Sequence, residues 1–296
     1  MHKSGKTVEL RAGDYHAKIV TTGAGLAQLT RCGRNLTLPH RPEDMPPAHL
    51  GKVLLPWPNR IANASYVFAN ETLQPAINDR ASGAAIHGLL AWHNWQIARK
   101  TDQTVILEAF LPPNYGYPFM LHAEVTWTLD SIAGLQARIC ATNIGNTDAP
   151  YGAGAHPYLT CDLEKIDSCE LHMPRSRLFD HTTRHYSSTE DAALDFSTPA
   201  LINATSIDHS FHITALTEQW EVRLVSPRQR LAVWLRGSQP WIQVYSGEKL
   251  GRKGLAVEPM SCPPDAFNSG IDLVRLKPGD THQLWFAIGG EDISQN

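Results

Sequence analysis

Two residues of the chain, Glu258 and His156, combine side chains suited to proton transfer with unusual surroundings. Glu258 follows Leu-Ala-Val and precedes a proline, so a single carboxylate stands in an apolar run. Such a charge is costly to bury unless it is paired or takes part in chemistry. His156 lies in the run Gly-Ala-Gly-Ala-His-Pro-Tyr. Imidazoles and carboxylates are frequent general acids and bases, so these two residues are candidates for that role.

Two further polar residues lie in similar segments punctuated by glycine and proline. Arg60 follows the run Leu-Leu-Pro-Trp-Pro-Asn, and His87 lies in Ala-Ile-His-Gly-Leu. Each of the four residues alone has an ordinary interpretation, because a histidine can satisfy a turn, an arginine can form a surface ion pair and a glutamate can cap a loop. Their occurrence together favours a functional site.

The elements that must position these residues are predicted to be β-strands. Alternating segments of 5–7 residues, rich in β-branched and aromatic side chains, occupy 125–129, 135–141, 221–225, 231–235 and 241–245. Alternation with a period of two places one face of each strand inward. No capped helical pattern of a dozen residues occurs. Short strands without intervening helices predict an all-β fold, a large antiparallel two-sheet β-sandwich.

The whole chain, residues 1–296, is predicted to form a single domain. All-β sandwiches reach this length as one domain, and 42% hydrophobic residues are enough for a large core. We interpret the proline-rich stretch 39–58 and the polar stretch 180–200 as loops within that domain, because neither has the composition of a linker.

Charge and cysteine usage indicate a soluble cytoplasmic protein. The net charge is −3 and no basic block occurs, so we expect neither a nucleic acid nor a membrane as partner. The first residues lack the apolar run of a signal peptide. Five scattered cysteines are most simply reduced thiols. The oligomeric state stays open, with a homodimer among the alternatives.

The ordered set of motifs resembles the signature of aldose 1-epimerases, the galactose mutarotase-like proteins. The set comprises Pro-Asn-Arg-Ile at 58–61, His-Gly at 87–88, Gly-Ala-His-Pro-Tyr at 154–158 and Gly-Leu-Ala-Val-Glu-Pro at 254–259. An Asp-x-x-Phe that begins at Asp208 also matches, and the resemblance runs from about residue 50 to 285. Each motif is weak alone, whereas the ordered set is specific.

The resemblance implies a β-sandwich with an open sugar cleft that needs neither a metal nor an organic cofactor. It implies that Glu258 is the general base and His156 the general acid, and that Arg60, His87 and Asp208 hold sugar hydroxyls. The chemistry fits these side chains. The carboxylate takes the proton of the C1 hydroxyl and the imidazolium protonates the ring oxygen, after which the ring opens, the aldehyde rotates and the ring closes on its other face.

Two departures from ordinary hexose mutarotases concern the choice of sugar. Residues 260–264 read Met-Ser-Cys-Pro-Pro, where a glutamine is typical, and residues 52–58 read Lys-Val-Leu-Leu-Pro-Trp-Pro, where a glycine-rich stretch is typical. This second string and Ser-Gly-Glu-Lys-Leu at 246–250 resemble sulfoquinovose mutarotases, whose substrate carries a C6 sulfonate. We therefore expect Arg60 to bind that anion, with Lys52 second, and Trp57 and Asn59 to line the site. Lys249 is interpreted as a solvated surface residue.

Other functions stay open on the sequence. A mutarotase of neutral hexoses and a hexose-6-phosphate 1-epimerase are the nearest alternatives, since phosphate also attracts arginine and lysine. A glycosidase could use Asp208 and Glu258, but it would leave the Gly-x-His-Pro-Tyr run without a role. A non-catalytic sugar-binding protein would keep the cleft, but it would typically lack the acid or the base, and this chain has both.

A metal site is the remaining alternative. The chain has 14 histidines, with close spacing at 181/185 and at 209/212. No His-Glu-x-x-His motif occurs and these positions are expected in loops, so we expect no metal.

Overall fold

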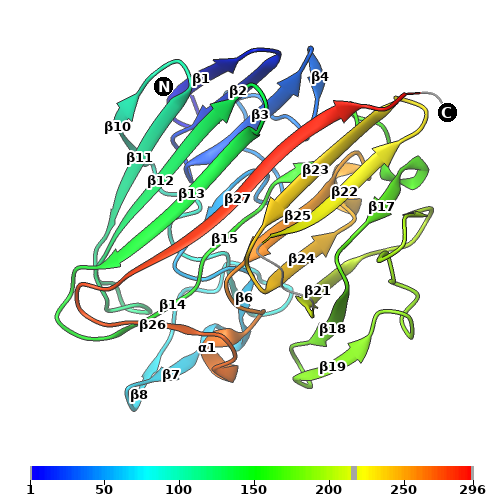
Figure 1. Ribbon diagram of the computed structural model, residues 1–296. Helices are drawn as coiled ribbons and strands as arrows, with labels where there is room; N and C mark the ends of the chain where they lie inside the picture. Colours follow the sequence, from blue (N-terminus) through cyan, green and yellow to red (C-terminus); the bar gives the residue numbers. More distant parts are fainter. Residues whose placement is uncertain (1, 215–218, 295–296) are drawn as a thin grey trace.

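The protein folds as two layers of antiparallel β-sheet (Figure 1). The structure is a computed structural model that describes residues 2–214 and 219–294. The first layer is a nine-stranded sheet. Its strands, in spatial order, are β10 (Gln96–Lys100), β11 (Thr104–Leu111), β12 (Leu121–Asp130), β13 (Gly134–Asn143), β27 (Thr281–Asp292), β23 (Leu231–Gly237), β22 (Trp220–Ser226), β17 (Glu170–His172) and β20 (Ala200–Leu201).

The second layer consists of an eight-stranded and a four-stranded sheet. The eight-stranded sheet contains β19 (His185–Ser188), β18 (Ser176–Asp180), β21 (Asp208–Ile213), β24 (Trp241–Tyr245), β25 (Leu255–Met260), β15 (Gly154–Ala155) and β5 (Val53–Leu54), with β16 (Tyr158–Leu159) also paired to β25. The four-stranded sheet contains β1 (Thr7–Ala12), β2 (Tyr15–Val20), β3 (Gly25–Arg31) and β4 (Arg34–Asn35).

The remaining elements are short. Three two-stranded ribbons join β6 (Arg60–Ile61) to β9 (Ala85–Ile86), β7 (Tyr66–Phe68) to β8 (Glu71–Leu73), and β14 (Ala149–Tyr151) to β26 (Val274–Leu276). The helical segments are α1 (Ala266–Ser269) and the 3-10 turns η1 (Ala62–Ala64), η2 (Ile166–Ser168) and η3 (Glu248–Leu250).

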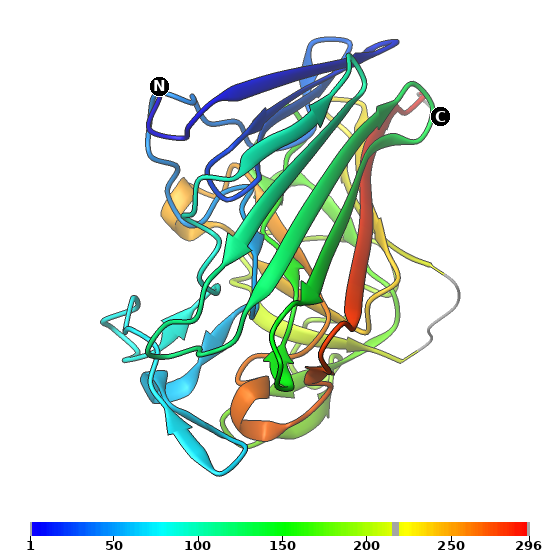
Figure 2. The same cartoon turned by 90° about the vertical axis from the view of Figure 1, so that its left-hand side faces the viewer.

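The core lies between the two layers because the strands alternate. Along β12 every second residue from Leu121 to Leu129 is buried, whereas the residues between them are partly exposed. These side chains join one hydrophobic cluster with residues of β1, such as Leu10, and of β25, such as Val257. Figure 2 shows β12, β13 and β27 side by side, with the four-stranded sheet near one end of these strands.

The all-β prediction is confirmed. All five predicted strands occur, as parts of β12, β13, β22 and β23 and as the whole of β24. The single α-helix of the described residues is one turn, α1. The two stretches interpreted as loops contain short strands, β5 in 39–58 and β19 in 180–200, so that interpretation was too coarse. All five cysteines are free thiols.

Candidate active site

The outer face of the eight-stranded sheet carries the polar residues that the motifs single out. On β25, Leu255 and Val257 belong to the core cluster, so Glu258, which alternates with them, projects from the opposite face. On β24, Ile242 and Val244 face the core in the same way, and Gln243 lies directly beside Glu258 in the strand register. The sheet therefore presents a polar row away from its core.

Glu258 and His156 form a close buried pair. The distance from His156 Nε2 to Glu258 Oε1 is 3.3 Å, and the two side chains are 6% and 3% exposed. Among the described residues, His156 Nδ1 and Glu258 Oε2 are buried without a hydrogen-bond partner. The His156 backbone is fixed next to β5, since its N–H donates to the Lys52 carbonyl and its carbonyl accepts from Gly51 N–H, each at 2.9 Å.

Burial favours the uncharged form of both members of this pair. It lowers the pKa of His156 to about 3, with nearby His49 adding to the effect. It raises the pKa of Glu258 well above its ordinary value, to which the Asp208 charge adds and against which Arg60 acts. Between these two pKa values the pair holds one proton. A pair of this kind can give a proton at one oxygen and take one at another.

Hydrogen bonds extend the polar row to Asp208. Ser210 Oγ donates to Gln243 Oε1, and Gln243 Nε2 donates to Asp208 Oδ1 at 2.8 Å. Ser210 and Gln243 are register partners on β21 and β24. Gln243 is buried, whereas Asp208 is exposed at the start of β21. The glutamine thus holds the Asp208 carboxylate at the mouth of the site.

The β6–β9 ribbon brings Arg60 and His87 to the same place. Arg60 pairs with Ile86, and His87 N–H donates to the Asn59 carbonyl at 2.7 Å. Asn59 and His87 both adopt left-handed backbone conformations, with φ of 50° and 63°. Asn59 Oδ1 accepts from Arg60 Nε at 3.1 Å. The two terminal guanidinium nitrogens of Arg60 form no hydrogen bond with the described residues.

These residues line two adjoining hollows that share Asn59, Arg60, Asp208 and Gln243. The inner hollow, about 200 Å³, reaches the Glu258–His156 pair and is also lined by His87. The outer hollow, about 390 Å³, extends over β18 and β21 toward His181. Together they form an open cleft on the outer face of the sheet.

Comparison with known proteins identifies the family. The family model described as aldose 1-epimerase matches residues 6–289. The chain belongs to the aldose 1-epimerase family. It is therefore an isomerase of the mutarotase type, a class of enzymes that interconvert the anomers of sugars.

Relatives of this aldose 1-epimerase agree with the assignment. The chain is 53% identical to a protein of Escherichia coli (strain K12) named uncharacterized protein YihR, over 98% of this chain and 95% of that protein. A GalM/aldose epimerase homologue from C. elegans superimposes with a TM-score of 0.86 at 21% identity, covering 98% and 99% of the two chains. A galactose 1-epimerase from Lactobacillus acidophilus NCFM superimposes with a TM-score of 0.81 at 20% identity, covering 97% of this chain and 94% of that chain. At these identities the two structures show the shared fold.

The inner hollow of this aldose 1-epimerase contains residues that sequence reasoning missed. His49 lies next to His87, with ring centroids 4.5 Å apart, and Tyr158 stacks on His156 at 5.1 Å. Tyr245 and Lys249 line the same hollow. Tyr158 belongs to the Gly-x-His-Pro-Tyr run and could have been selected from that motif. His49 has no motif, and Lys249 had been interpreted as a solvated surface residue.

Lys52 and Trp57, two of the predicted binding residues, line neither hollow. Lys52 is buried, donates from Nζ to the Thr22 carbonyl at 2.6 Å and lies over the Trp92 ring. Burial lowers the pKa of Lys52 to about 8. Trp57 is in the core and donates from Nε1 to the Ala85 carbonyl. Both side chains therefore lie outside the two hollows, and their role in substrate binding stays a prediction.

Residues 2–214 and 219–294 contain no group of three or more histidine, cysteine, aspartate or glutamate side chains arranged to hold a metal ion. In the same part of the chain no helix is long and apolar enough to cross a membrane.

Proposed function

We propose that this aldose 1-epimerase interconverts the anomers of a glucopyranose with an anionic group at C6, most simply sulfoquinovose. The observation that carries the proposal is the buried Glu258–His156 pair, 3.3 Å apart, at the base of a cleft that is also lined by Arg60 and Lys249. The pair supplies the proton transfers, and the cations supply the selectivity for an anion.

In the proposed reaction the pair works with its one proton. Moving that proton from Glu258 to His156 across their contact creates a carboxylate and an imidazolium. The carboxylate then takes the proton of the C1 hydroxyl while the imidazolium protonates the ring oxygen, and the C1–O5 bond breaks. After rotation about C1–C2 the aldehyde is attacked from its other face, and both protons return. No proton is gained or lost overall, so the pair is ready for the next sugar.

The other cleft residues are proposed to hold the sugar. Asp208 accepts hydrogen bonds from hydroxyl groups, and Gln243 keeps its carboxylate in place. His87 and Asn59 line the same hollow as the pair. His87 Nδ1 is buried without a hydrogen-bond partner among the described residues, which suits contact with a hydroxyl.

The anionic substituent is proposed on two grounds. The sequence departs from ordinary hexose mutarotases around residues 52–58 and 260–264, both close in the chain to cleft residues. The cleft also offers two cations, Arg60 and Lys249, and neither forms an ion pair within the described part of the chain. An ionised sulfonate loses hydration when it enters a cleft, and such cations offset that loss.

Anomer-exchange NMR on a panel of sugars tests the proposal. The panel is sulfoquinovose, glucose 6-phosphate, glucose and galactose, each at anomeric equilibrium with catalytic amounts of enzyme. We expect the highest kcat/KM for sulfoquinovose. A preference for glucose or galactose would refute the anionic substrate, a preference for glucose 6-phosphate would identify a phosphate-selective enzyme, and exchange with none of the four would favour a sugar-binding protein.

A further inference from the structure

A tight turn, Gly247–Arg252, brings Lys249 to the inner hollow. The turn contains η3, which is flanked by two left-handed glycines, Gly247 with φ of 70° and Gly251 with φ of 66°. Leu250 N–H donates to the Gly247 carbonyl at 2.9 Å, and Gly251 N–H donates to the Glu248 carbonyl at 3.1 Å. A Cβ at position 247 would lie 2.4 Å from the Gly254 carbonyl oxygen. The backbone path of the turn therefore depends on glycine there.

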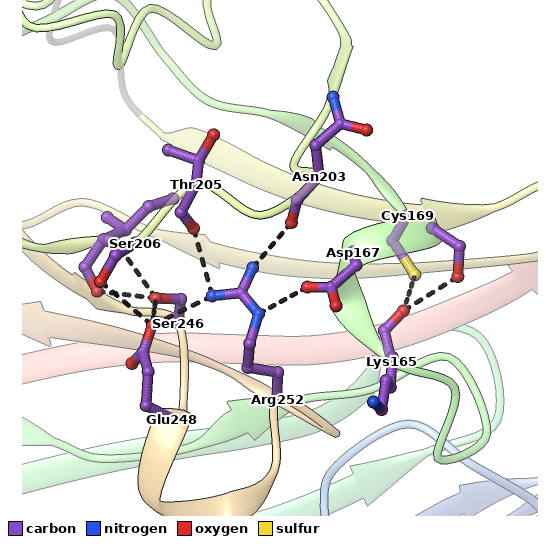
Figure 3. Close-up of polar contacts among 11 residues, drawn as sticks. Lys165, Asp167, Cys169, Asn203, Thr205, Ser206, Ser246, Glu248 and Arg252 are labelled. Carbon is purple, nitrogen blue, oxygen red and sulfur yellow. Dashed lines mark hydrogen bonds and ion pairs between the residues drawn. The ribbon is translucent and has the colours of Figure 1, made fainter.

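The outer side of the turn is clamped by Arg252, whose guanidinium lies at the centre of Figure 3. It donates to the carboxylate of Asp167 and, at 3.0 Å, to that of Glu248. It also donates to the carbonyls of Asn203 and Thr205, at 2.8 and 3.2 Å. The Arg252 side chain is only 16% exposed. A partly buried arginine with this many partners fixes the segments that it joins.

Glu248 gives the clamp a second point of attachment. Its Oε1 accepts hydrogen bonds from Ser206 Oγ, at 3.2 Å, and from Ser246 Oγ, in addition to the one from Arg252 (Figure 3). Glu248 directly precedes Lys249, so its side chain holds the turn from outside while Lys249 lines the hollow.

The inner side of the turn is attached to the aromatic wall next to the acid–base pair. Lys249 N–H donates to the Tyr245 hydroxyl at 3.0 Å. The Tyr245 ring lies 6.4 Å from that of Tyr158, which stacks on His156. The backbone position of Lys249 is thus defined relative to the place where the sugar ring must react.

Acidic and basic side chains both line the inner hollow, and Arg60 and Lys249 are the arginine and lysine among them. Of the acidic residues that line it, Asp79 accepts from Ser82, Asp208 accepts from Gln243 and Glu258 is paired with His156. Lys249 is exposed, and its ammonium forms no hydrogen bond or ion pair with the described residues. Burial is the main cause of the lowered pKa of His49, and the Ser82 hydrogen bond is the main cause for Asp79; the Lys249 charge adds a smaller effect in the same direction to both.

We propose that Lys249 binds the anionic C6 substituent of the sugar together with Arg60, and that Arg252 is a positioning residue that holds the Lys249 turn. The inference rests on the proposed function, because it needs an anionic substrate. It assigns selectivity to the turn and leaves proton transfer to Glu258 and His156. Sulfonate and phosphate share the chemistry that a lysine and an arginine bind.

The test compares K249A with K253A, a matched change of an exposed lysine four residues further along that lines neither hollow. Exchange NMR on each purified protein gives kcat/KM for sulfoquinovose, glucose 6-phosphate and glucose. We expect K249A to lower the ratio of sulfoquinovose to glucose by about ten- to a hundredfold, the range for a hydrogen bond to a charged group. K253A should keep the wild-type ratio. The effect of K249A on glucose 6-phosphate tells whether Lys249 binds sulfonate alone or both sulfonate and phosphate.

R252A tests the positioning role. R252A should lower the ratio of kcat/KM for sulfoquinovose to kcat/KM for glucose. We expect this to come mainly from a higher KM for sulfoquinovose, with a smaller change in kcat for glucose, because the acid–base pair stays in place. If R252A does not fold, D167N and E248Q weaken the same clamp one contact at a time. Equal losses of glucose and sulfoquinovose turnover would mean that Arg252 supports the whole site, and would refute its positioning role.

The outcomes separate this inference from the proposed function. A wild-type enzyme without a preference for anionic sugars refutes the anionic substrate, and with it the role of Lys249. A wild-type preference for sulfoquinovose that persists in K249A refutes only the role of Lys249 and leaves Arg60 as the anion-binding residue.

Discussion

At the level of single residues, the proposed chemistry depends on one proton shared by two buried groups. Glu258→Gln and His156→Asn each remove one partner of the transfer while they keep the approximate size of the side chain. We expect each variant to lower kcat by at least ~10², the usual contribution of a positioned acid or base. Anomer-exchange NMR measures the rate, and circular dichroism checks the fold.

The double variant adds a sharper test of the same pair. Because both groups serve one exchange, the loss in the double variant should be far less than the product of the two single losses. Near wild-type exchange in either folded single variant would show that the reaction does not use this pair.

Arg60 is predicted to distinguish charged from neutral sugars. The Arg60 side chain lines the cleft, and its Nε donates a hydrogen bond to Asn59 Oδ1. Arg60→Ala should lower kcat/KM for sulfoquinovose much more than for glucose, so that the ratio of the two values falls by about tenfold or more. Arg60→Lys keeps the charge but loses the planar fork, so it should recover only part of the difference. Equal losses on the two sugars would assign Arg60 to the neutral hydroxyls.

At the level of elements, the cleft depends on close contacts between connecting segments outside the large sheets, such as the contact between Gly88 and Leu55. A Cβ at Gly88 would lie 2.1 Å from the Leu55 carbonyl oxygen, and φ there is +72°. Gly83 has a similar φ of +68°, with nothing within 4 Å of its Cβ position. A substitution at either glycine therefore causes backbone strain of about 1 kcal/mol, whereas only a substitution at Gly88 also creates a clash with Leu55.

Gly88→Ala is therefore predicted to destabilise the protein more than Gly83→Ala. The clash must push apart the segments that carry His87 and Arg60, so G88A should also lower kcat/KM. Urea unfolding gives the free energy of unfolding for each variant. Equal effects of the two changes would mean that the contact between Gly88 and Leu55 relaxes at no cost.

The sequence predicted strands better than it predicted how loops place side chains. Segment 241–245 coincides with β24, because its alternation directly reflects the two faces of the sheet. The four motif residues Arg60, His87, His156 and Glu258 do meet in one hollow. The burial of Lys52 was not foreseen, because its ammonium donates to the Thr22 carbonyl, a partner 30 positions earlier that no local pattern reveals.

Lys249, which the sequence analysis interpreted as a solvated surface residue, lines the inner hollow. Its neighbours in the sequence are those of a solvated turn, and we propose that its position on the cleft depends on the contact between Arg252 and Asp167, 85 residues away. Such contacts between distant segments cannot be read from alternation or from short motifs. The family resemblance pointed to the residues proposed for proton transfer, whereas Lys249 and Arg252, proposed for selectivity, required the folded chain.

At the level of the whole molecule, one hydrophobic cluster runs from β1 to β27 through both layers. A shared core favours unfolding in one cooperative step, which fits the prediction that residues 1–296 form a single domain. Limited proteolysis tests that prediction, since two stable halves would contradict it.

The histidines of the cleft predict how the stability of the whole fold depends on pH. Burial lowers the pKa of His49 from 6.5 to about 4, and that of His156 from 6.5 to about 3. The pKa of His87 is lowered well below 6.5 for the same reason. The unfolded chain, in which these rings are solvated, therefore binds more protons than the native state below pH 6.5, and stability is lost as the pH falls from there toward 4. Glu258, whose pKa is raised, has the opposite effect on the pH dependence of stability, but it is a single group, whereas three histidines act together.

We expect the free energy of unfolding to be roughly constant between pH 7 and 8, below the range in which Lys52 titrates, and to fall steadily between pH 6.5 and 4. A fully buried histidine contributes up to about 1.4 kcal/mol per pH unit over this range, and the partly exposed His49 contributes less because solvent screens it. His49→Gln removes one titrating ring, so its unfolding free energy should fall less steeply with pH than that of the wild type, while the change at pH 8 gives the purely structural cost. Urea unfolding at half-unit pH steps measures both slopes. Parallel curves for the two proteins would show that His49 is as readily protonated in the folded cleft as in the unfolded chain.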